Sequence, residues 1–175
     1  MKTHEYKGIL TTEGWKENVQ IKTDELGVIQ SIENVAHKHE MDQYALPGFQ
    51  NAHSHAFQYA MAGLAEFHSN SPAQNDFWSW RNAMYDLALS INPEQLEKIA
   101  TLLYKEMLRH GYTHVVEFHY LHHNIKGKNY NNLSETGERL IAAAKKTGIK
   151  ITLVPIFYQM GGFNKPPEEK QRRFI

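Results

Sequence analysis

The sequence contains no cysteine, so disulfide bonds, thiolate metal ligands and a cysteine nucleophile are all excluded. It also has no excess of either charge, because lysine plus arginine and aspartate plus glutamate each number 19. This balance gives no indication of binding to nucleic acid or to an acidic membrane surface. No stretch approaches the ~20 apolar residues of a membrane span, and the first residues lack the apolar core of a signal peptide. We therefore expect a soluble cytoplasmic protein.

The glycine-rich motifs of nucleotide-binding proteins are also missing. No G-x-G-x-x-G follows the first strand expected after residue 45, and no glycine-rich loop carries a lysine. A dinucleotide-binding fold and a phosphate-binding loop are therefore disfavoured. What remains is a composition typical of a folded domain, with 41% hydrophobic and 22% charged residues among 175. Eleven histidines favour metal or proton chemistry.

The first 35 residues predict a small antiparallel sheet. Apolar residues alternate with polar ones around Val19 and Ile21, as in a strand with one buried face. The stretch Asp24–Gly27 predicts a hairpin turn, because its glycine can adopt a positive φ. Residues 36–44 are mostly polar and predict a linker.

From residue 45 onward, the expected elements follow the order strand, helices, strand, helix, strand. This order is typical of βα units that build a parallel sheet. Such connections are right-handed and close either a doubly wound sheet or a barrel. The sequence thus predicts the α/β class. Strands are expected over residues 45–52, 112–120 and 149–156, and a polar tail over residues 164–173.

The expected helices are recognised by their start signals and apolar stripes. Asn92 caps the clearest of them, because Pro93 occupies its first turn and Gln95 completes a capping box. Ser134 is expected to cap the helix that Gly148 ends. The stripes expected to face the core are Phe57, Met61 and Leu64 (helix 56–66); Phe77, Trp80, Met84 and Leu87 (helix 76–89); Leu96, Ile99, Leu103 and Met107 (the helix capped by Asn92); and Leu140, Ile141 and Ala144 (the helix capped by Ser134).

An H-x-H pair, His53 and His55, stands at the end of the first strand of this region. Residues two apart in an extended strand point to the same side, so the two imidazoles should converge and could bind a metal. The alternative is two partly exposed histidines at a strand edge. His37 and His39 have the same spacing but lie in a polar stretch, so we interpret them as loop residues.

The second expected strand also ends in residues that can carry chemistry, His119 and Tyr120. The carboxyl ends of the strands are where a β/α barrel carries its active site. His119, His122 and His123 could form a second metal cluster, but their spacing divides them between strand and loop. Glu117 is either a satisfied buried carboxylate or a partner of a metal ligand, and the sequence does not distinguish these alternatives.

Four segments together resemble the amidohydrolase superfamily and, within it, the formimidoylglutamate deiminases of histidine degradation. The H-x-H strand is shared across the superfamily, whereas the run from His53 through Ala65, the W-x-W-R motif and E-F-H-Y-L-H-H are more specific to that deiminase. The resemblance covers essentially the whole chain but only the first half or less of those enzymes. The segments are P-G-F-Q-N-A-H-S-H-A-F-Q (47–58), F-W-S-W-R (77–81), E-F-H-Y-L-H-H (117–123) and Q-R-R-F-I (171–175).

The resemblance implies a (β/α)8 TIM-type barrel and a site with one zinc ion per subunit. His53 and His55 match the first two metal ligands, and Gln58, Arg81 and Tyr120 match residues that contact the substrate. The implied reaction is hydrolysis of N-formimino-L-glutamate to N-formyl-L-glutamate and ammonia. This substrate is a dicarboxylate, and a guanidinium presents a planar fork of donors to a carboxylate. Spacing alone, without the resemblance, favours a surface cation at Arg81 and a half-buried aromatic ring at Tyr120.

The set of active-site residues is incomplete in this chain. A catalytic zinc usually has three protein ligands and a water, and the chain supplies two ligands. The family's other ligands and its acid/base residues lie beyond position 175, so we assign no catalytic residue here. We expect an N-terminal fragment that is inactive alone and forms a homodimer when complete. Residues 1–45 would be part of a small β-sandwich, and residues 46–175 the first part of the barrel.

Two other functions stay open. The first is a different amidohydrolase, such as a purine or pyrimidine aminohydrolase, which shares the H-x-H pair but has no evident need for an arginine at Arg81. The second is a non-catalytic domain that binds a metal or a protein.

Overall fold

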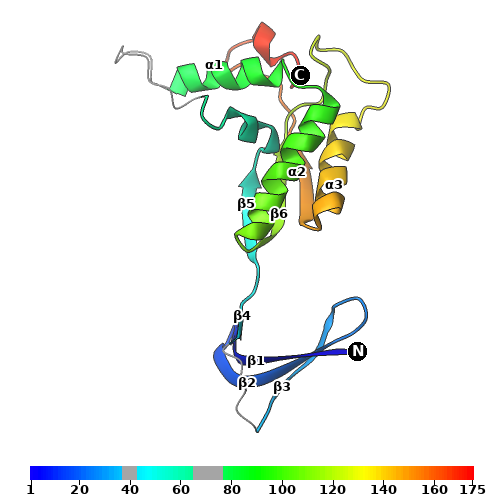
Figure 1. Ribbon diagram of the computed structural model, residues 1–175. Coiled ribbons are helices and arrows are strands. Elements are labelled where there is room, and N and C mark those ends of the chain that lie inside the picture. Colours follow the sequence, from blue (N-terminus) through cyan, green and yellow to red (C-terminus); the bar gives the residue numbers. More distant parts are fainter. Residues whose placement is uncertain (37–42, 65–76) are drawn as a thin grey trace. The chain divides into compact units, whose positions relative to one another are not determined.

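The computed structural model describes residues 1–36, 43–64 and 77–175. The chain forms two compact units, Met1–Gly48 and Phe49–Ile175, which are labelled by their elements in Figure 1. The division falls after Gly48, three residues later than the boundary expected after residue 45.

The unit Met1–Gly48 is a four-stranded sheet. Strands β1 (Lys2–Thr11), β2 (Gly14–Thr23) and β3 (Ile29–Asn34) pair in antiparallel fashion, and the short β4 (Tyr44–Ala45) pairs parallel to β1. The expected antiparallel sheet is therefore confirmed, with Ile9, Val19 and Ile21 as its buried core.

The turn between β2 and β3 is built by Asp24. Its Oδ1 accepts the backbone N–H groups of Leu26 and Val28, each at 2.9 Å. Gly27 has a φ of +80°, which a side chain at that position would disfavour. The expected turn at Asp24–Gly27 is thus present.

The unit Phe49–Ile175 contains a parallel sheet of three strands, β5 (Phe49–Ser54), β6 (Tyr112–His119) and β7 (Lys150–Pro155), in that order. The predicted α/β class is confirmed. The single strand expected over residues 45–52 is wrong, because its two ends belong to different sheets. Ala45 ends β4, and Pro47, which has no N–H to donate to a sheet, lies in the segment that separates β4 from β5.

Helices α2 (Pro93–Arg109) and α3 (Glu135–Thr147) lie side by side and pack against the sheet (Figure 1). Helix α1 (Phe77–Ala88) and the 3₁₀ helix η1 (Ala56–Met61) contact each other, and η1 also packs against α2. The buried face of β6 and the inner faces of these helices form one core. Its members include Phe57, Met84, Leu96, Ala100, Tyr104, Val115, Leu140 and Ala144.

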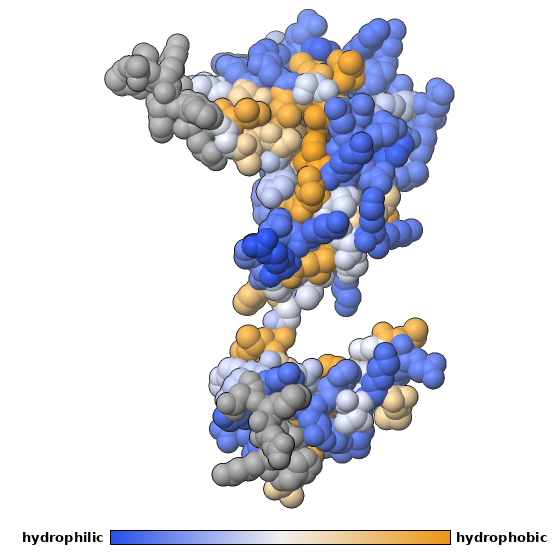
Figure 2. Space-filling model, viewed as in Figure 1, coloured by the Kyte–Doolittle hydropathy of each residue, from blue (hydrophilic) through white to orange (hydrophobic). Residues whose placement is uncertain are grey.

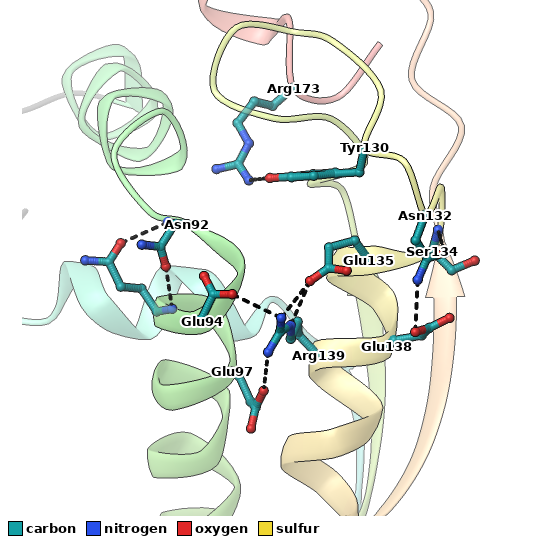
Figure 3. Close-up of polar contacts among 11 residues, drawn as sticks. Asn92, Glu94, Glu97, Tyr130, Asn132, Ser134, Glu135, Glu138, Arg139 and Arg173 are labelled. Carbon is teal, nitrogen blue, oxygen red and sulfur yellow. Dashed lines mark hydrogen bonds and ion pairs between the residues drawn. The ribbon is translucent and has the colours of Figure 1, made fainter.

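Polar contacts fix the start of α2 and its pairing with α3 (Figure 3). The Asn92 side chain accepts the Gln95 N–H at 2.8 Å, and the Gln95 side chain accepts the Asn92 N–H at 2.9 Å, so the predicted capping box is present. Arg139 on α3 bonds Glu94 and Glu97 on α2 at 3.0 and 3.2 Å. Because these charged groups are reached by solvent, each pair contributes little to stability.

Two of the expected apolar stripes are partly wrong. The helix expected over residues 56–66 is a 3₁₀ helix that ends at Met61, and Leu64 is 66% exposed. In α1, Met84 is buried, but Phe77 and Trp80 are 62% and 38% exposed. Helical periodicity alone does not distinguish a side chain that faces the core from one that faces an open pocket.

Two further expectations fail near the ends of elements. Ser134 precedes α3, but its side chain makes no capping hydrogen bond; instead its N–H donates to Asn132 Oδ1 at 3.0 Å. The polar tail expected over residues 164–173 contains a 3₁₀ helix, η3 (Glu169–Gln171), with Gln171 and Arg173 fully buried. Polarity therefore did not indicate exposure in this segment.

Apolar side chains also remain on the surface of the second unit. Leu102, Phe157 and Phe163 are 58%, 85% and 100% exposed, and hydrophobic residues show between hydrophilic ones on the face drawn in Figure 2. Within the described sheet, β5 and β7 each pair with β6 alone. None of the helices in the described segments is long and apolar enough to cross a membrane.

Candidate functional site

The two histidines of the H-x-H pair converge at the carboxyl end of β5. Asn51 pairs with Val115 and Ser54 with Glu117, so β5 contains one more residue than β6 over this interval. Such a bulge changes the direction of side chains beside it. His53 lies within the bulge and His55 just after the strand, and their Nε2 atoms are 3.0 Å apart.

The His55 ring is held by the neighbouring strand. Its Nδ1 lies 3.0 Å from the backbone oxygen of Phe118, which can only accept a hydrogen bond. Nδ1 therefore carries the proton, and Nε2, which faces His53 Nε2, carries the lone pair that a metal would use. The ring of His53 stacks on Phe118 with centroids 4.6 Å apart.

This donor pair fits a zinc ion. Zn–N bonds of about 2.0–2.1 Å in a tetrahedral site place two nitrogens about 3.3 Å apart, close to the observed separation. In the described segments, however, no group of three or more histidine, aspartate or glutamate side chains is arranged to hold a metal. The pair therefore supplies part of a metal site. His37 and His39 lie outside the described residues.

A pocket of about 240 Å³ brings together four of the five residues predicted for the site: His55, Gln58, Arg81 and Tyr120. His53, the fifth, does not line the pocket itself, but its Nε2 lies 3.0 Å from the Nε2 of His55, which does. The four come from η1 and its preceding residue, from α1 and from the end of β6. The rest of the wall is mainly aromatic and apolar: Phe57, Phe77, Trp80, Met84, Tyr85, Tyr158 and Phe174.

Arg81 on α1 is a half-buried cation, because its side chain is only 15% exposed. The interpretation as a surface cation is therefore wrong. Its Nε donates to the Tyr85 hydroxyl at 3.0 Å, and its Nη2 donates to Gly161 O and Glu168 Oε1 at 3.0 and 3.3 Å. Burial lowers the pKa of Arg81, but its contacts with Tyr85 and Glu168 outweigh this and raise it above the ordinary value. The guanidinium is therefore charged and fixed in direction.

Tyr120 is half-buried, and its ring lies 5.2 Å from that of His55 and 5.9 Å from that of Phe174. The sequence left two alternatives, a half-buried aromatic or a residue that contacts the substrate. Because Tyr120 is half-buried and also lines the pocket, both descriptions apply to it.

Sequence reasoning missed the residues that hold Arg81 in place. The fully buried Gln171 donates from Nε2 to the hydroxyls of Tyr85 and Tyr158 at 2.9 and 3.1 Å and to Gly161 O at 3.3 Å. Burial and the contact with Tyr85 raise the pKa of Tyr158 to about 12. Gln171 occurs in a polar stretch without periodicity, so no local signal distinguished it.

Glu117 on β6 is a buried carboxyl beneath the histidine pair, 1% exposed. Its Oε1 accepts the Ala56 N–H at 2.5 Å. Burial raises its pKa, although contacts with Ala56, Ser54 and Tyr104 act in the opposite direction. Burial and the charge of Glu117 also raise the pKa of the Tyr104 hydroxyl.

The alternative of a second metal cluster is not supported. His119 is buried and its Nε2 lies 3.1 Å from Thr136 Oγ1, whereas His122 Nε2 lies 2.8 Å from Ile156 O. These two rings thus have separate protein partners. Together with His123 they form no group able to hold a metal among the described residues.

Comparison with known proteins agrees with this fold and identifies the family. Residues 44–173 match the amidohydrolase family. The chain is 45% identical over 170 residues to the formimidoylglutamate deiminase of Pseudomonas aeruginosa, covering 95% of the chain and 37% of that protein. It thus spans little more than a third of the length of this relative.

Solved structures are similar as well. A crystal structure of an amidohydrolase from Brucella melitensis superposes with a TM-score of 0.89 at 46% identity, over 99% of this chain and 39% of that one. An atrazine chlorohydrolase from Arthrobacter aurescens, solved in complex with zinc, gives a TM-score of 0.60 at 18% identity, over 85% and 34%, and so supports the fold alone. With its α/β architecture, its converging histidines and a family match across most of its length, this chain belongs to the amidohydrolase family.

Proposed function

We propose that the chain carries part of the active site of a zinc-dependent deiminase. The reaction proposed is hydrolysis of N-formimino-L-glutamate to N-formyl-L-glutamate and ammonia. The observation that carries this proposal is the pocket in which His55, Gln58, Arg81 and Tyr120 meet. The similarity to a protein named formimidoylglutamate deiminase supports the choice of substrate.

His53 and His55 would hold the zinc ion through their Nε2 atoms. When bound, zinc lowers the pKa of a coordinated water to ~7 and so supplies hydroxide for attack on the formimino carbon. The hydrogen bond from His55 Nδ1 to Phe118 O keeps the ring in the tautomer that a metal requires. Further ligands would come from parts of a longer protein, as in the relatives that this chain covers only in part.

Arg81 would bind a carboxylate of the substrate. The Tyr85 hydroxyl and Gly161 O hold its guanidinium beside the pocket, so little side-chain freedom is lost when an anion binds. Gln58 and Tyr120 would add polar contacts on the same wall. Glu168, whose carboxylate is 3.3 Å from Arg81, occupies one of the cation's donors before substrate arrives.

The chain's own residues would supply two metal ligands and part of the substrate-binding wall, and we assign none of them as the acid or base. General acid/base groups are needed to protonate the departing ammonia. We therefore expect no turnover by the 175 residues alone. Strong ammonia release by the isolated chain would contradict this assignment.

The proposal is tested in a chimera in which this chain replaces the matching segment of the Pseudomonas aeruginosa relative. We expect zinc-dependent ammonia release from N-formimino-L-glutamate, abolished by His53→Ala or His55→Ala. Arg81→Gln should raise KM about 10- to 100-fold, as expected when a charge-assisted hydrogen bond is lost. Arg109→Gln, which changes an exposed arginine on α2, is the matched control and should leave KM unchanged.

Two outcomes would contradict the proposal. One is a folded, zinc-containing chimera that hydrolyses adenosine or cytosine but not N-formimino-L-glutamate. The other is an unchanged KM for N-formimino-L-glutamate after Arg81→Gln, which would favour an amidohydrolase that binds no carboxylate at this position.

A further inference from the structure

Glu117 has no role in the proposed function, although it is a buried carboxyl that pairs in register with Ser54, between the two histidines in the sequence. It lies on the face of β6 that packs against the helices, together with Val115 and His119. Ser54 of β5 is buried beside it. The two histidines lie on β5 and directly after it, so Glu117 is placed between the metal-binding turn and the core.

Only one of the two oxygens of the Glu117 carboxyl accepts a well-formed hydrogen bond from the described part of the chain. Oε1 accepts the Ala56 N–H at 2.5 Å, and Ser54 also contacts the carboxyl. Oε2 faces the hydroxyl of the equally buried Tyr104, but among the described residues neither atom makes a hydrogen bond of normal geometry. An apolar side chain of the same size would remove this poorly paired oxygen, but it would also leave the buried Ala56 N–H without its acceptor, which costs free energy. The carboxyl is therefore needed for the backbone at Ala56 rather than for filling space in the core.

Glu117 holds a stretch of backbone that lies outside the regular strand pairing of the sheet. The regular pairing of β5 with β6 is interrupted between Asn51 and Ser54, where the bulge contains His53. After Ser54 the strand ends, so His55 and Ala56 have no ladder partner on β6. Two contacts from β6 replace the ladder: the Glu117 side chain binds Ala56 N–H, and Phe118 O binds His55 Nδ1.

We propose that Glu117 is a positioning residue for the metal-binding pair, acting through its hydrogen bond to the Ala56 N–H. This inference rests on the proposed metal site and goes beyond it. The hydrogen bond fixes the backbone directly after His55, which keeps the Nδ1 of that ring against Phe118 O and its Nε2 directed at His53. Without an acceptor at position 117, the His55 ring would sample other orientations and both tautomers.

Two substitutions of nearly equal volume separate positioning from packing. Glu117→Gln keeps an oxygen that can accept the Ala56 N–H, whereas Glu117→Met fills the same space without an acceptor. Val115→Ala is the matched control, because it disturbs the same buried face of β6 but leaves the acceptor of the Ala56 N–H in place. The probes are zinc alone, titrated into the chain, and the tautomer of His55 in the metal-free chain, read from two-bond ¹H–¹⁵N correlations of the imidazole.

We expect Glu117→Met to lower the unfolding midpoint, because the buried Ala56 N–H loses its acceptor, to weaken zinc binding at least about tenfold, and to lose the Nδ1–H tautomer of His55. Glu117→Gln should stay within about threefold of the parent and keep that tautomer. Val115→Ala should lower the midpoint but leave zinc affinity and tautomer unchanged.

The inference is overturned by any of three results. These are parental zinc affinity and tautomer in Glu117→Met, failure of Glu117→Met to fold, or an equal loss of zinc affinity in Val115→Ala. The proposed metal site fails separately if zinc binding is absent or is unchanged by His53→Ala. The tautomer of His55 in the metal-free chain would then still decide the role of Glu117.

Discussion

Arg173 is the strongest test of how the second unit is held together. Its guanidinium is 1% exposed and donates to the backbone oxygens of Ala88, Ile91 and His123 and to the Tyr130 hydroxyl (Figure 3 shows the last contact). Burial lowers its pKa, although contact with Tyr130 acts in the opposite direction. The side chain therefore joins the end of α1, the start of α2 and the loop after β6.

The expected cost of Arg173→Met follows from these contacts. Hydrogen bonds from a charged donor contribute about 1.5–3 kcal/mol each, so losing three to carbonyls costs about 4.5–9 kcal/mol. Removing a buried cation recovers several kcal/mol of desolvation free energy. The net loss in the free energy of unfolding should be about 2–5 kcal/mol.

Urea unfolding followed by tryptophan fluorescence measures this loss. A Trp15→Phe background leaves Trp78 and Trp80 of α1 as reporters of the second unit. Arg172→Met is the matched control, because the neighbouring arginine also donates to backbone oxygens but is 34% exposed, and it should cost less than about 1 kcal/mol. An Arg173→Met chain within about 0.5 kcal/mol of the parent, or no less stable than the Arg172→Met chain, would refute the reasoning.

Three further predictions concern other parts of the second unit. Burial lowers the pKa of His119 to about 3, so between pH 6.5 and 3 the unfolded chain binds a proton that the folded chain does not. The free energy of unfolding should therefore fall by up to about 1.4 kcal/mol per pH unit as the pH is lowered through this range. His119→Gln should remove this slope in urea titrations from pH 7 to 4. A Cβ on Gly161 would lie 2.2 Å from Pro166 O, so Gly161→Ala should lower the thermal midpoint, whereas Gly162→Ala, whose Cβ meets nothing closer than 3.6 Å, should leave it nearly unchanged. Asn92→Ala removes the α2 cap and should cost about 1 kcal/mol in urea unfolding; no loss would mean that tertiary packing alone fixes the start of this helix.

The sequence by itself determined the elements whose signals lie within a few residues of one another. The capping box at Asn92 and Gln95, the turn at Asp24–Gly27 and the left-handed Gly148 at the end of α3 each depend on local backbone geometry. The order of strands and helices likewise predicted the α/β class and the parallel sheet. The resemblance to amidohydrolases came from short segments and was confirmed by the family match.

Tertiary structure decided which side chains share a pocket and which are buried. Arg81 is held in its half-buried position partly by hydrogen bonds to Gly161 and Glu168, which lie 80 and 87 positions further along the chain. Gln171 and Arg173 are buried although their segment is polar, because their partners come from α1, from the α1–α2 connection and from distant loops. The convergence of the two histidines followed from their spacing, but the orientation of the His55 ring depends on Phe118 of β6. Local pattern carries no information about such contacts, since each is made by residues that meet only after the sheet and its helices have assembled.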